Sequence, residues 1–418
     1  MKKIRNLFKK TSVKFGASAT ILNIVLMISN ILVIYWISPK LMGIWNSFMI
    51  FISYIYIIQM GIINGFSREL PFFFGAKKLN IVNRISSITL LVVKYSTIVS
   101  IVTSLLLTLY FFLFFEPIYF YSSFVFGLLA SIQFYNNYLL STYRSSDAFD
   151  KLTKVFTMQI FIVFSTIFLV PLMGYKGNLV RLSVLGLTQL LFLHYDRPLK
   201  VKPLWNVKLF KHLLYLGSRL FIFNYVYWLI PTFVRIIILQ LGTTLHVGLY
   251  SPAIAVNSLM MLLPTTLSQY FYPKMSAQLG ETRSTKTVMV YSFVVMKKMF
   301  YILFAITLIG LFTLPFFIKT FLPDYFVGIV PAQLAVISGL FSGLGLSLYT
   351  ALITIKKFKL LSILLLLKAL LFYSMIYFFG LKYSLLYGVS IGLLISETLF
   401  FAILVSCALI ILKKIDVK

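Results

Sequence analysis

Six basic side chains lie within, or at the edge of, long apolar segments. A cation near the centre of a bilayer costs roughly 2.5–3.5 kcal/mol on insertion scales, so each one needs a physical reason. The six are Lys94, Arg219, Arg235, Lys297, Lys298 and Lys368. Four of them, Lys94, Arg219, Lys297 and Lys298, lie close enough to basic loops for their side chains to extend to the membrane interface. Arg235 and Lys368 are deeper, and they are the candidates for a function.

Two further observations bear on these deep cations. Arg235 lies about five residues from the far end of its apolar segment, so it either reaches that interface or faces the protein interior. Glu397, near the middle of the last apolar segment, needs a cationic partner, and either Lys368 or Arg235 fits. Such a pair is either purely structural or part of the working site. The sequence leaves both questions open.

An arginine facing an internal cavity favours an anionic substrate. Its guanidinium binds phosphate oxygens in a bidentate manner and stays charged at any working pH. A cation carrier would need buried acids instead. The apolar segments around residues 16–66 and 216–271 contain no Asp or Glu, and Glu69 follows only beyond them. A phosphate-containing substrate is therefore predicted.

The remaining charges define a membrane topology. Of 38 Lys and Arg, 27 fall in alternate loops and both termini, and five fall in the opposite loops (Lys40, Lys176, Arg181, Lys319 and Lys382). This asymmetry places both termini and the basic loops in the cytoplasm. With 60% hydrophobic residues and 11% charged residues, the chain is not a soluble globule. Its net charge of +29 favours contact with anionic lipid over nucleic acid, because the cations flank apolar runs.

Twelve apolar segments are long enough to cross a bilayer as helices. Their approximate limits are 16–37, 42–66, 85–114, 119–142, 155–173, 179–195, 216–240, 246–271, 288–318, 326–354, 361–381 and 384–412. We expect an all-α polytopic membrane protein with 12 transmembrane helices in two pseudo-symmetric six-helix bundles around a central cavity. The predicted domains are bundles 1–195 and 216–418, joined by a cytoplasmic, basic, amphipathic linker at 196–215.

The two halves carry matching landmarks. Gly16 precedes Asn23 by seven residues, and Gly217 precedes Asn224 by the same interval. Gly43 opens the second apolar segment as Gly248 opens the eighth. An even number of spans in each half gives both halves the same orientation. Transporters are commonly built from such repeats, with the substrate site between them.

Polar residues align on single helical faces of the first two segments of each half. One interpretation is that they are hydrogen-bonding contacts between packed helices. The other is that they line a hydrated cavity, and their matching positions favour it. The predicted cavity residues are Arg68, Arg235, Asn23, Asn64, Asn224, Trp228 and Asn257; the possible charge pair is Lys368 with Glu397.

Two stretches carry a resemblance to a known family. GIINGFSRELPFFFGAKK (61–78), preceded by WISPKLMGIWN (36–46), resembles the second-helix region of Wzx-type polysaccharide flippases, which carry O-antigen or teichoic acid precursors. Residues 247–281 resemble the eighth-helix region of the same multidrug/oligosaccharidyl-lipid/polysaccharide exporter superfamily. That superfamily also contains MATE drug exporters and MurJ-type lipid II flippases.

The resemblance implies a V-shaped pair of bundles that moves undecaprenyl-pyrophosphate-linked oligosaccharide across the bacterial inner membrane. It also implies a lumen lined with cations, for which Arg68 and Arg235 are the available residues. The acids by which MATE exporters couple cations, in the first and seventh helices, are missing here. Partners of the same pathway would be a polysaccharide polymerase and glycosyltransferases, and lipopolysaccharide or O-antigen synthesis would be the context.

Three alternatives remain open. A non-transporting, lipid-binding scaffold would fit the composition but would leave the aligned polar residues unexplained. A MATE-like antiporter of small molecules would share the fold. A membrane polysaccharide polymerase or glycosyltransferase would need a sizeable external loop or an acidic catalytic pair, and the sequence shows neither. His194, His212 and His246 are too dispersed to suggest a metal site. We therefore expect a transporter without catalytic residues or a cofactor.

Overall fold

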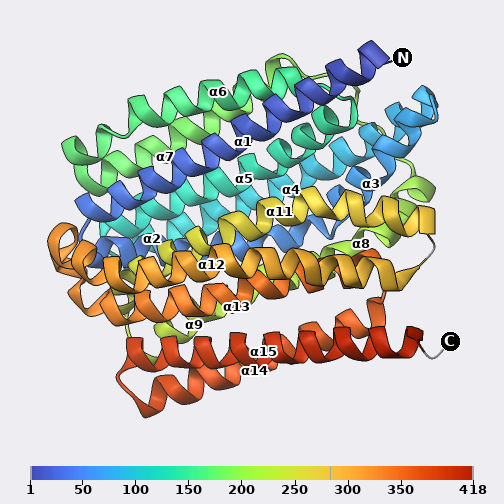
Figure 1. Cartoon of the computed structure of the whole chain (residues 1–418). Helices are drawn as coiled ribbons and strands as arrows, with labels where there is room; N and C mark the ends of the chain where they lie inside the picture. The colour runs from blue at the N-terminus through green and yellow to red at the C-terminus, as the bar shows by residue number, and fades with distance from the viewer. Residues whose placement is uncertain (1, 283, 417–418) are drawn as a thin grey trace. The chain divides into compact units, whose positions relative to one another are not determined.

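The chain folds into long helices joined by short connections. The computed structural model describes residues 2–282 and 284–416, without the side chains of residues 2–13, 220, 224, 228, 269, 270, 273, 274, 276–278, 280–282 and 414–416. No strand occurs in these ranges, and the predicted all-α polytopic class is confirmed. Within each part of the molecule the long helices lie side by side (Figure 1).

The helices follow the apolar segments closely. In the first half they are α1 (Lys2–Trp36), α2 (Pro39–Ile55), the 3-10 turn η1 (Tyr56–Gln59), α3 (Ile62–Gly75), α4 (Leu79–Phe114), α5 (Pro117–Ser145), α6 (Phe149–Thr166) and α7 (Leu169–Tyr195). In the second half they are α8 (Val207–Leu229), α9 (Thr232–Leu241), α10 (Thr244–Leu249), α11 (Ser251–Thr282), α12 (Thr285–Phe321), η2 (Pro323–Gly328), α13 (Ile329–Thr354), α14 (Phe358–Lys382) and α15 (Leu385–Asp416).

Eight of the described helical segments are individually long and apolar enough to cross a bilayer, and two bent pairs, α6 with α7 and α8 with α9, raise the number to ten. The bend between α6 and α7 is 115°, so the chain turns back there and each helix matches one predicted span. The eight single segments, α6 and α7 counted separately, the α8–α9 pair and α11 together account for all twelve predicted segments. The predicted end of the fifth span at residue 173 is wrong, because α6 already ends at Thr166.

The helices pack into two compact units. The first comprises Met1–Ile37 and Phe48–Tyr225, and the second comprises Ser38–Ser47 and Val226–Lys418. Helices α2 and α8 are continuous from one unit into the other. Basic residues 207–215, predicted as part of a separate linker, form the first turns of α8. The predicted domains 1–195 and 216–418 remain a prediction. A segment of one predicted domain can pack in the unit formed mainly by the other, as Ser38–Ser47 does.

Small polar residues hold α4 against α5 in the first unit. Ser131 donates to Ser100 at 3.0 Å, and Ser123 donates to Thr108 at 3.2 Å. Between these two hydrogen bonds, Gly127 packs directly on the Ser104 side chain. The spacing of four residues keeps all of these groups on one face of each helix. Because lipid is as apolar as Leu, such close packing and hydroxyl hydrogen bonds stabilise the pair better than apolar burial would.

Small residues also allow close packing of α11 against α13 in the second unit. Gly339 packs on Met260, and Gly343 packs on Pro264. Both glycines therefore allow α11 and α13 to approach each other closely. A buried cluster that includes Met299 and Leu303 of α12 surrounds this contact.

A break in the second predicted span is fixed by close packing against α8. Met60 and Gly61 adopt φ values of 48° and 82°, which end η1 and allow α3 to begin. Gly61 is suited to this left-handed conformation, which L side chains rarely adopt. A Cβ on Gly217 would also clash with the backbone of Gly61 and lie 2.6 Å from the Gly65 nitrogen. Glycine at 217 is therefore required by the approach of two backbones.

Several local features recur in the two halves of the sequence. Asp147 and Lys356, which precede α6 and α14, have φ values of 55° and 57° in equivalent turns. Gly43 and Gly248, matched in the sequence, pack backbone to backbone within the second unit. These repeats support the prediction of two related halves.

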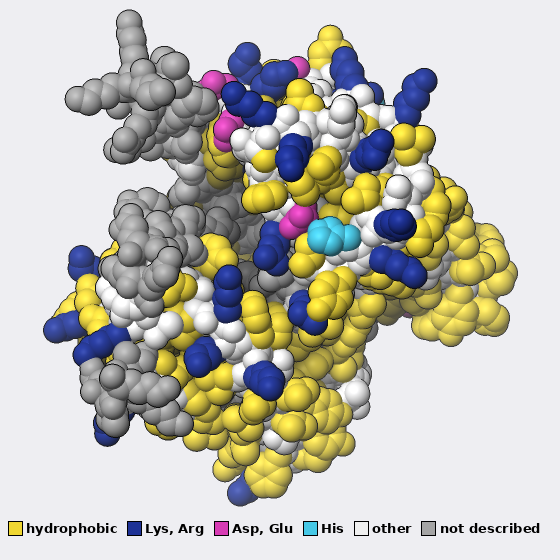
Figure 2. All heavy atoms as spheres, turned by 90° about the vertical axis from the view of Figure 1, so that its right-hand side faces the viewer, with side chains coloured by type: hydrophobic (Ala, Val, Ile, Leu, Met, Phe, Trp, Pro, Cys, Tyr) yellow, Lys and Arg dark blue, Asp and Glu magenta, His cyan; other side chains and the backbone are white. Residues whose placement is uncertain are grey.

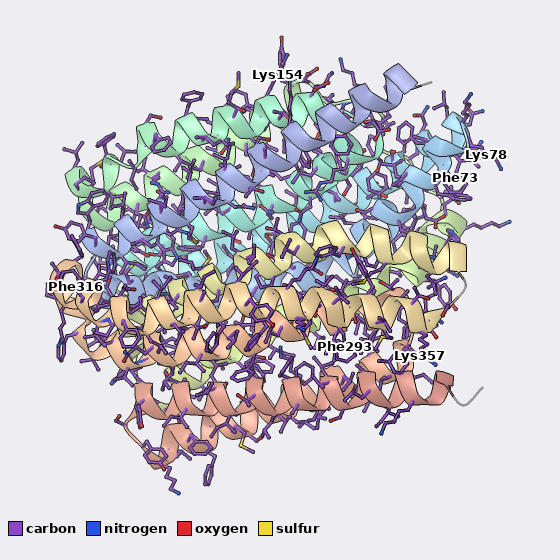
Figure 3. The ribbon with its side chains drawn as sticks, in the orientation of Figure 1. Phe73, Lys78, Lys154, Phe293, Phe316 and Lys357 are labelled. Carbon is purple, nitrogen blue, oxygen red and sulfur yellow. The ribbon has the colours of Figure 1, made fainter. Side chains whose placement is uncertain are left out.

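Charge is concentrated at one end of the helices in each unit. Figure 2 views a face on which Lys and Arg side chains are numerous and Asp and Glu are few. In the second unit, Lys357 lies at one end and Phe316 lies at the other (Figure 3). In the first unit, Lys78 lies at the end of the helices (Figure 3). This distribution follows the loop charges from which cytoplasmic termini were predicted; the orientation itself stays a prediction.

Replacing Gly217 with Ala should destabilise the protein by about 1–3 kcal/mol, because the added methyl group meets backbone atoms that cannot move aside. The measurement is denaturant-induced unfolding of purified protein in detergent. Gly16→Ala is the matched control, since nothing lies within 4 Å of a Cβ at Gly16. It should leave stability unchanged or raise it by up to about 1 kcal/mol. Equal losses in both variants would contradict the close approach of α3 and α8.

Candidate functional site: deep cations

Arg235 lies in α9, directly after a helix break. Pro231 cannot donate the backbone hydrogen bond that would continue α8, and α9 starts at Thr232. Helix α9 packs against α14 and α15 in the second unit. The Arg235 side chain is half-buried, and it forms no ion pair or hydrogen bond with any residue that the structure describes. The guanidinium therefore keeps all of its donors for another group.

Lys368 and Glu397 lie together inside the same unit. Lys368 Nζ is 3.5 Å from Glu397 Oε1, and the two residues are 2% and 5% exposed. The sequence left Lys368 and Arg235 as alternative partners, and the structure places Lys368 at the carboxylate. The rings of Tyr227, Phe372 and Phe400 surround the ammonium group, with centroids 4.5–4.9 Å from Nζ. This cage adds cation–π attraction to the ion pair.

The two deep cations of the second unit therefore differ in kind. Lys368 has a carboxylate and three aromatic faces, so its charge is compensated within the protein. Arg235 has none of these partners among the described residues. An uncompensated cation away from water is costly, and intramembrane charges of this kind typically mark a substrate pathway. The arrangement suits Arg235 to an anionic ligand and Lys368 to a structural role.

Arg68 lies on α3 in the first unit and is exposed. Its neighbour Glu69 contacts His212 of α8, with Glu69 Oε2 3.5 Å from His212 Nε2. Arg219, one to two turns further along α8, stacks on Tyr215 and donates a hydrogen bond of 2.7 Å to the Tyr215 hydroxyl. Helix α8, which packs against α3, thus carries further basic groups, and neither Arg68 nor Arg219 forms an ion pair in the described part of the chain.

The predicted asparagines have varied surroundings. Asn23 on α1 is exposed, and Asn64 on α3 and Asn257 on α11 are partly exposed. The side chains of Asn224 and Trp228 lie outside the described residues. All three described asparagines therefore retain accessible surface. Their proposed role in a cavity stays a prediction.

Other polar groups on or next to these helices make packing contacts. Asn46 Nδ2 donates to Ser251 Oγ at 2.9 Å inside the second unit. The Tyr225 hydroxyl donates to the Ser53 carbonyl at 2.7 Å in the first unit. The Asn46–Ser251 bond is a side-chain contact of the helix-packing kind, whereas the Ser53 contact uses only the backbone carbonyl.

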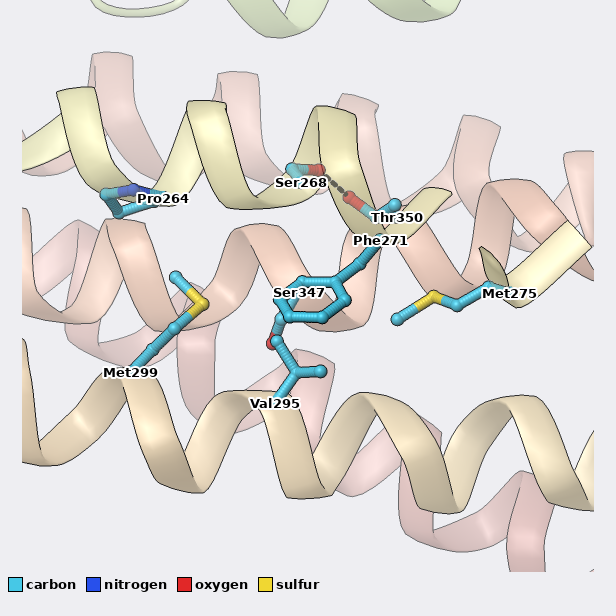
Figure 4. A pocket seen from close by; sticks show the side chains of 8 residues that line it. All are labelled: Pro264, Ser268, Phe271, Met275, Val295, Met299, Ser347 and Thr350. Carbon is cyan, nitrogen blue, oxygen red and sulfur yellow. Dashed lines mark hydrogen bonds between the residues drawn. The ribbon is translucent and has the colours of Figure 1, made fainter. Parts of the chain in front are cut away.

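A small hollow opens between α11, α12 and α13 in the second unit (Figure 4). Ser268 and Thr350 close one side of it, with their hydroxyl oxygens 2.5 Å apart. Phe271, Val295 and Met299 supply much of the remaining wall. Its free volume of about 10 Å³ is close to the minimum for one water molecule, so it is too small for a substrate headgroup.

The sequence-based placement of Arg181 in an external loop is wrong. Arg181 lies inside the first unit and is only 1% exposed. The external connection ends earlier than predicted, because Gly174 breaks α7 near its start and Tyr175 begins its straight part. A usable signal was present: Asn178 lies three residues before Arg181 and shares its helical face. The exposed Lys94, Lys297 and Lys298, by contrast, lie on the outer surfaces of α4 and α12.

Comparison with solved structures identifies the fold. The chain is similar to the inward-facing conformation of a multidrug resistance MATE family transporter of the MOP superfamily, with a TM-score of 0.76 and 15% identity over 95% of this chain and 99% of that one. It is also similar to the outward-facing conformation of such a transporter (TM-score 0.68, 16% identity, 98% and 97% covered) and to a MATE protein in the straight conformation (0.66, 15%, 98% and 97%).

These similarities extend over nearly the whole chain, and at 15–16% identity they show the fold alone. No protein-family model matches the chain, and no curated protein matches its sequence. The fold is therefore that of the MATE transporters of the MOP superfamily, which have twelve transmembrane helices in two bundles.

The Lys368–Glu397 pair gives a stability prediction. Lys368→Met or Glu397→Leu alone should destabilise the protein by about 3–5 kcal/mol, because each leaves one buried charge without its partner. The double variant should recover most of that loss, since two apolar side chains of similar size replace the pair. Unfolding of all three purified variants measures the coupling. Additive losses in the double variant would show that the two groups do not compensate each other.

Proposed function

We propose that the chain is a flippase that moves undecaprenyl-pyrophosphate-linked oligosaccharide from the cytoplasmic to the outer leaflet by alternating access. The observation that carries this proposal is the free guanidinium of Arg235, a deep cation without a carboxylate among the described residues. A pyrophosphate group supplies the missing negative charge. Its oxygens match the planar donors of arginine in a bidentate geometry.

The distribution of acids supports an anionic cargo. Helices α1, α2, α9 and α10 contain no Asp or Glu, and α3 contains only Glu69, which contacts His212. The only acid on α14 or α15 before residue 416 is Glu397, and Lys368 compensates it. A carrier of organic cations would need carboxylates that are free to bind its cargo.

The fold supports a mechanism in which two units alternate. The similar structures include both inward-facing and outward-facing conformations of MATE family transporters. In our proposal, Arg235 binds the pyrophosphate and Arg68 and Arg219 attract it at the cytoplasmic entrance. The polyprenyl tail stays in lipid while the sugar and phosphates cross.

The membrane potential favours this direction. An interior-negative potential assists outward movement of negative charge by about 2.3 kcal/mol per charge per 100 mV. Two phosphate charges that cross without neutralisation would gain on the order of 5 kcal/mol. Full neutralisation by co-transported cations would remove this gain.

This function implies a location and partners. The protein would lie in the cytoplasmic membrane of a bacterium with both termini in the cytoplasm, beside anionic lipid. The oligosaccharide would come from glycosyltransferases and pass to a polysaccharide polymerase, as in O-antigen or teichoic acid synthesis.

A MATE-like antiporter of small molecules is the second candidate, because the solved structures of this fold are MATE proteins. Reconstituted vesicles separate the two functions. Efflux of a cationic dye driven by a sodium or proton gradient would support the antiporter. Movement of a fluorescent polyprenyl-pyrophosphate glycan without such efflux would support the flippase.

Arg235→Ala should slow flipping of the labelled glycan lipid roughly 10- to 100-fold, because it removes charge-assisted hydrogen bonds worth about 1.5–3 kcal/mol. Arg235→Lys should retain part of the rate, since it keeps the charge and loses the bidentate geometry. Lys319→Ala, which removes an exposed cation over the Phe326 ring, is the matched control and should flip normally. Normal flipping by folded Arg235→Ala protein would exclude Arg235 from the site.

A further inference from the structure

Arg181 is a buried cation in the first unit for which no acidic partner is present among the described residues. It is 1% exposed, and it forms no ion pair with any described residue. Lys368, which is equally buried, has Glu397 beside it. An isolated charge in the interior costs several kcal/mol unless other groups compensate it. The chain therefore compensates one buried cation with its own carboxylate and leaves the other uncompensated.

The groups around Arg181 are all neutral. Arg181 Nη2 donates to Ser29 Oγ of α1 at 2.5 Å, and Nη1 donates to Asn178 Oδ1 at 3.4 Å. Both partners are themselves buried, Ser29 at 4% and Asn178 at 0% exposure. These contacts orient the guanidinium, but they bring no negative charge to it.

Two buried donors in this cluster have no acceptor. Arg181 Nε and Asn178 Nδ2 are both inaccessible and make no hydrogen bond in the described part of the chain. The Ser29 hydroxyl accepts from Arg181, so its own proton is available for a further acceptor. Buried donors without acceptors are rare in folded proteins, and they typically point to a water molecule or an ion. A positive charge next to donors without acceptors favours an anion.

We propose that Arg181, Asn178 and Ser29 form a binding site for a small monovalent anion, chloride under physiological conditions, between α1 and α7. No water-sized space adjoins these donors in the described structure, so the anion would enter by a small separation of α1 and α7, which a lipid headgroup or a sugar phosphate is too large to use. Gly174 breaks α7 seven residues before Arg181, so the site lies about two turns from that break. The anion neutralises Arg181 and fixes α7 to α1. The site is independent of the proposed transport function.

The test compares halide with a large anion at equal ionic strength. The thermal unfolding temperature of the purified full chain is measured in sodium gluconate with increasing sodium chloride. Wild-type protein should show a saturable rise, because a ligand that binds only the folded state stabilises it by mass action. An unchanged unfolding temperature would overturn the proposal and assign the unpaired donors to water.

Variants locate the effect. Arg181→Met should abolish the chloride-dependent rise, and Asn178→Ala should raise the half-maximal chloride concentration about tenfold through loss of one hydrogen bond to a charged group. Lys176→Met is the matched control, because Lys176 is an exposed cation on the same helix, and it should respond as wild type. An equal chloride response in Arg181→Met protein would overturn the site.

A second measurement covers the case in which Arg181→Met does not fold. Crystals of wild-type protein grown in bromide should give an anomalous peak within hydrogen-bonding distance of Arg181 Nε. Ser29→Ala and Asn178→Ala should reduce its occupancy. Bromide elsewhere in the crystal with none at Arg181 would contradict the proposal.

Discussion

The central constraint on this protein is that a charge held away from water must find a partner. Three deep cations differ in how far their charge is compensated. Lys368 is held by Glu397 and three aromatic rings, and Arg181 is held by neutral groups that leave donors unpaired. Arg235 is half-buried and has no partner among the described residues. Because membrane insertion penalises each of these charges, the way in which each is compensated indicates its role. A fully compensated pair stabilises the fold, whereas an uncompensated cation is available to a ligand.

The backbone shows where such a fold can change direction. Helices α2 and α8 continue from one compact unit into the other. The path of the second span breaks at η1, where Met60 and Gly61 adopt left-handed conformations, and α8 ends next to Pro231. The close backbone contact of Gly217 with Gly61 lies at the first of these breaks. Breaks of this kind confine any bending of the backbone to a few residues, as the proposed alternating access requires.

Much of the fold was predictable from the sequence, since apolar length and loop charge determine helix number and order. The twelve predicted segments are largely helical, although the second is interrupted at Met60–Gly61 and the seventh is divided between α8 and α9. The end of the fifth span was missed because Thr166 ends α6 within an apolar run that gives no hydropathy signal. Lys368 was predictable as a partner of Glu397, although only the structure distinguished it from Arg235. Arg181 was misplaced for a similar reason: loop counting assigned it to the external surface, and its burial depends on the fold around Gly174. Single charges beside a loop are therefore the least predictable part of such a sequence.

The most direct test of the account is equilibrium binding of a soluble, short-prenyl pyrophosphate glycan to the purified protein. Its monophosphate and its neutral alcohol are measured in parallel, at several salt concentrations. We expect affinity to fall from the pyrophosphate to the monophosphate to the alcohol, and Arg235→Met to remove most of the difference. Equal affinity for the neutral alcohol, with no effect of Arg235→Met, would contradict the assignment of Arg235 to an anionic headgroup.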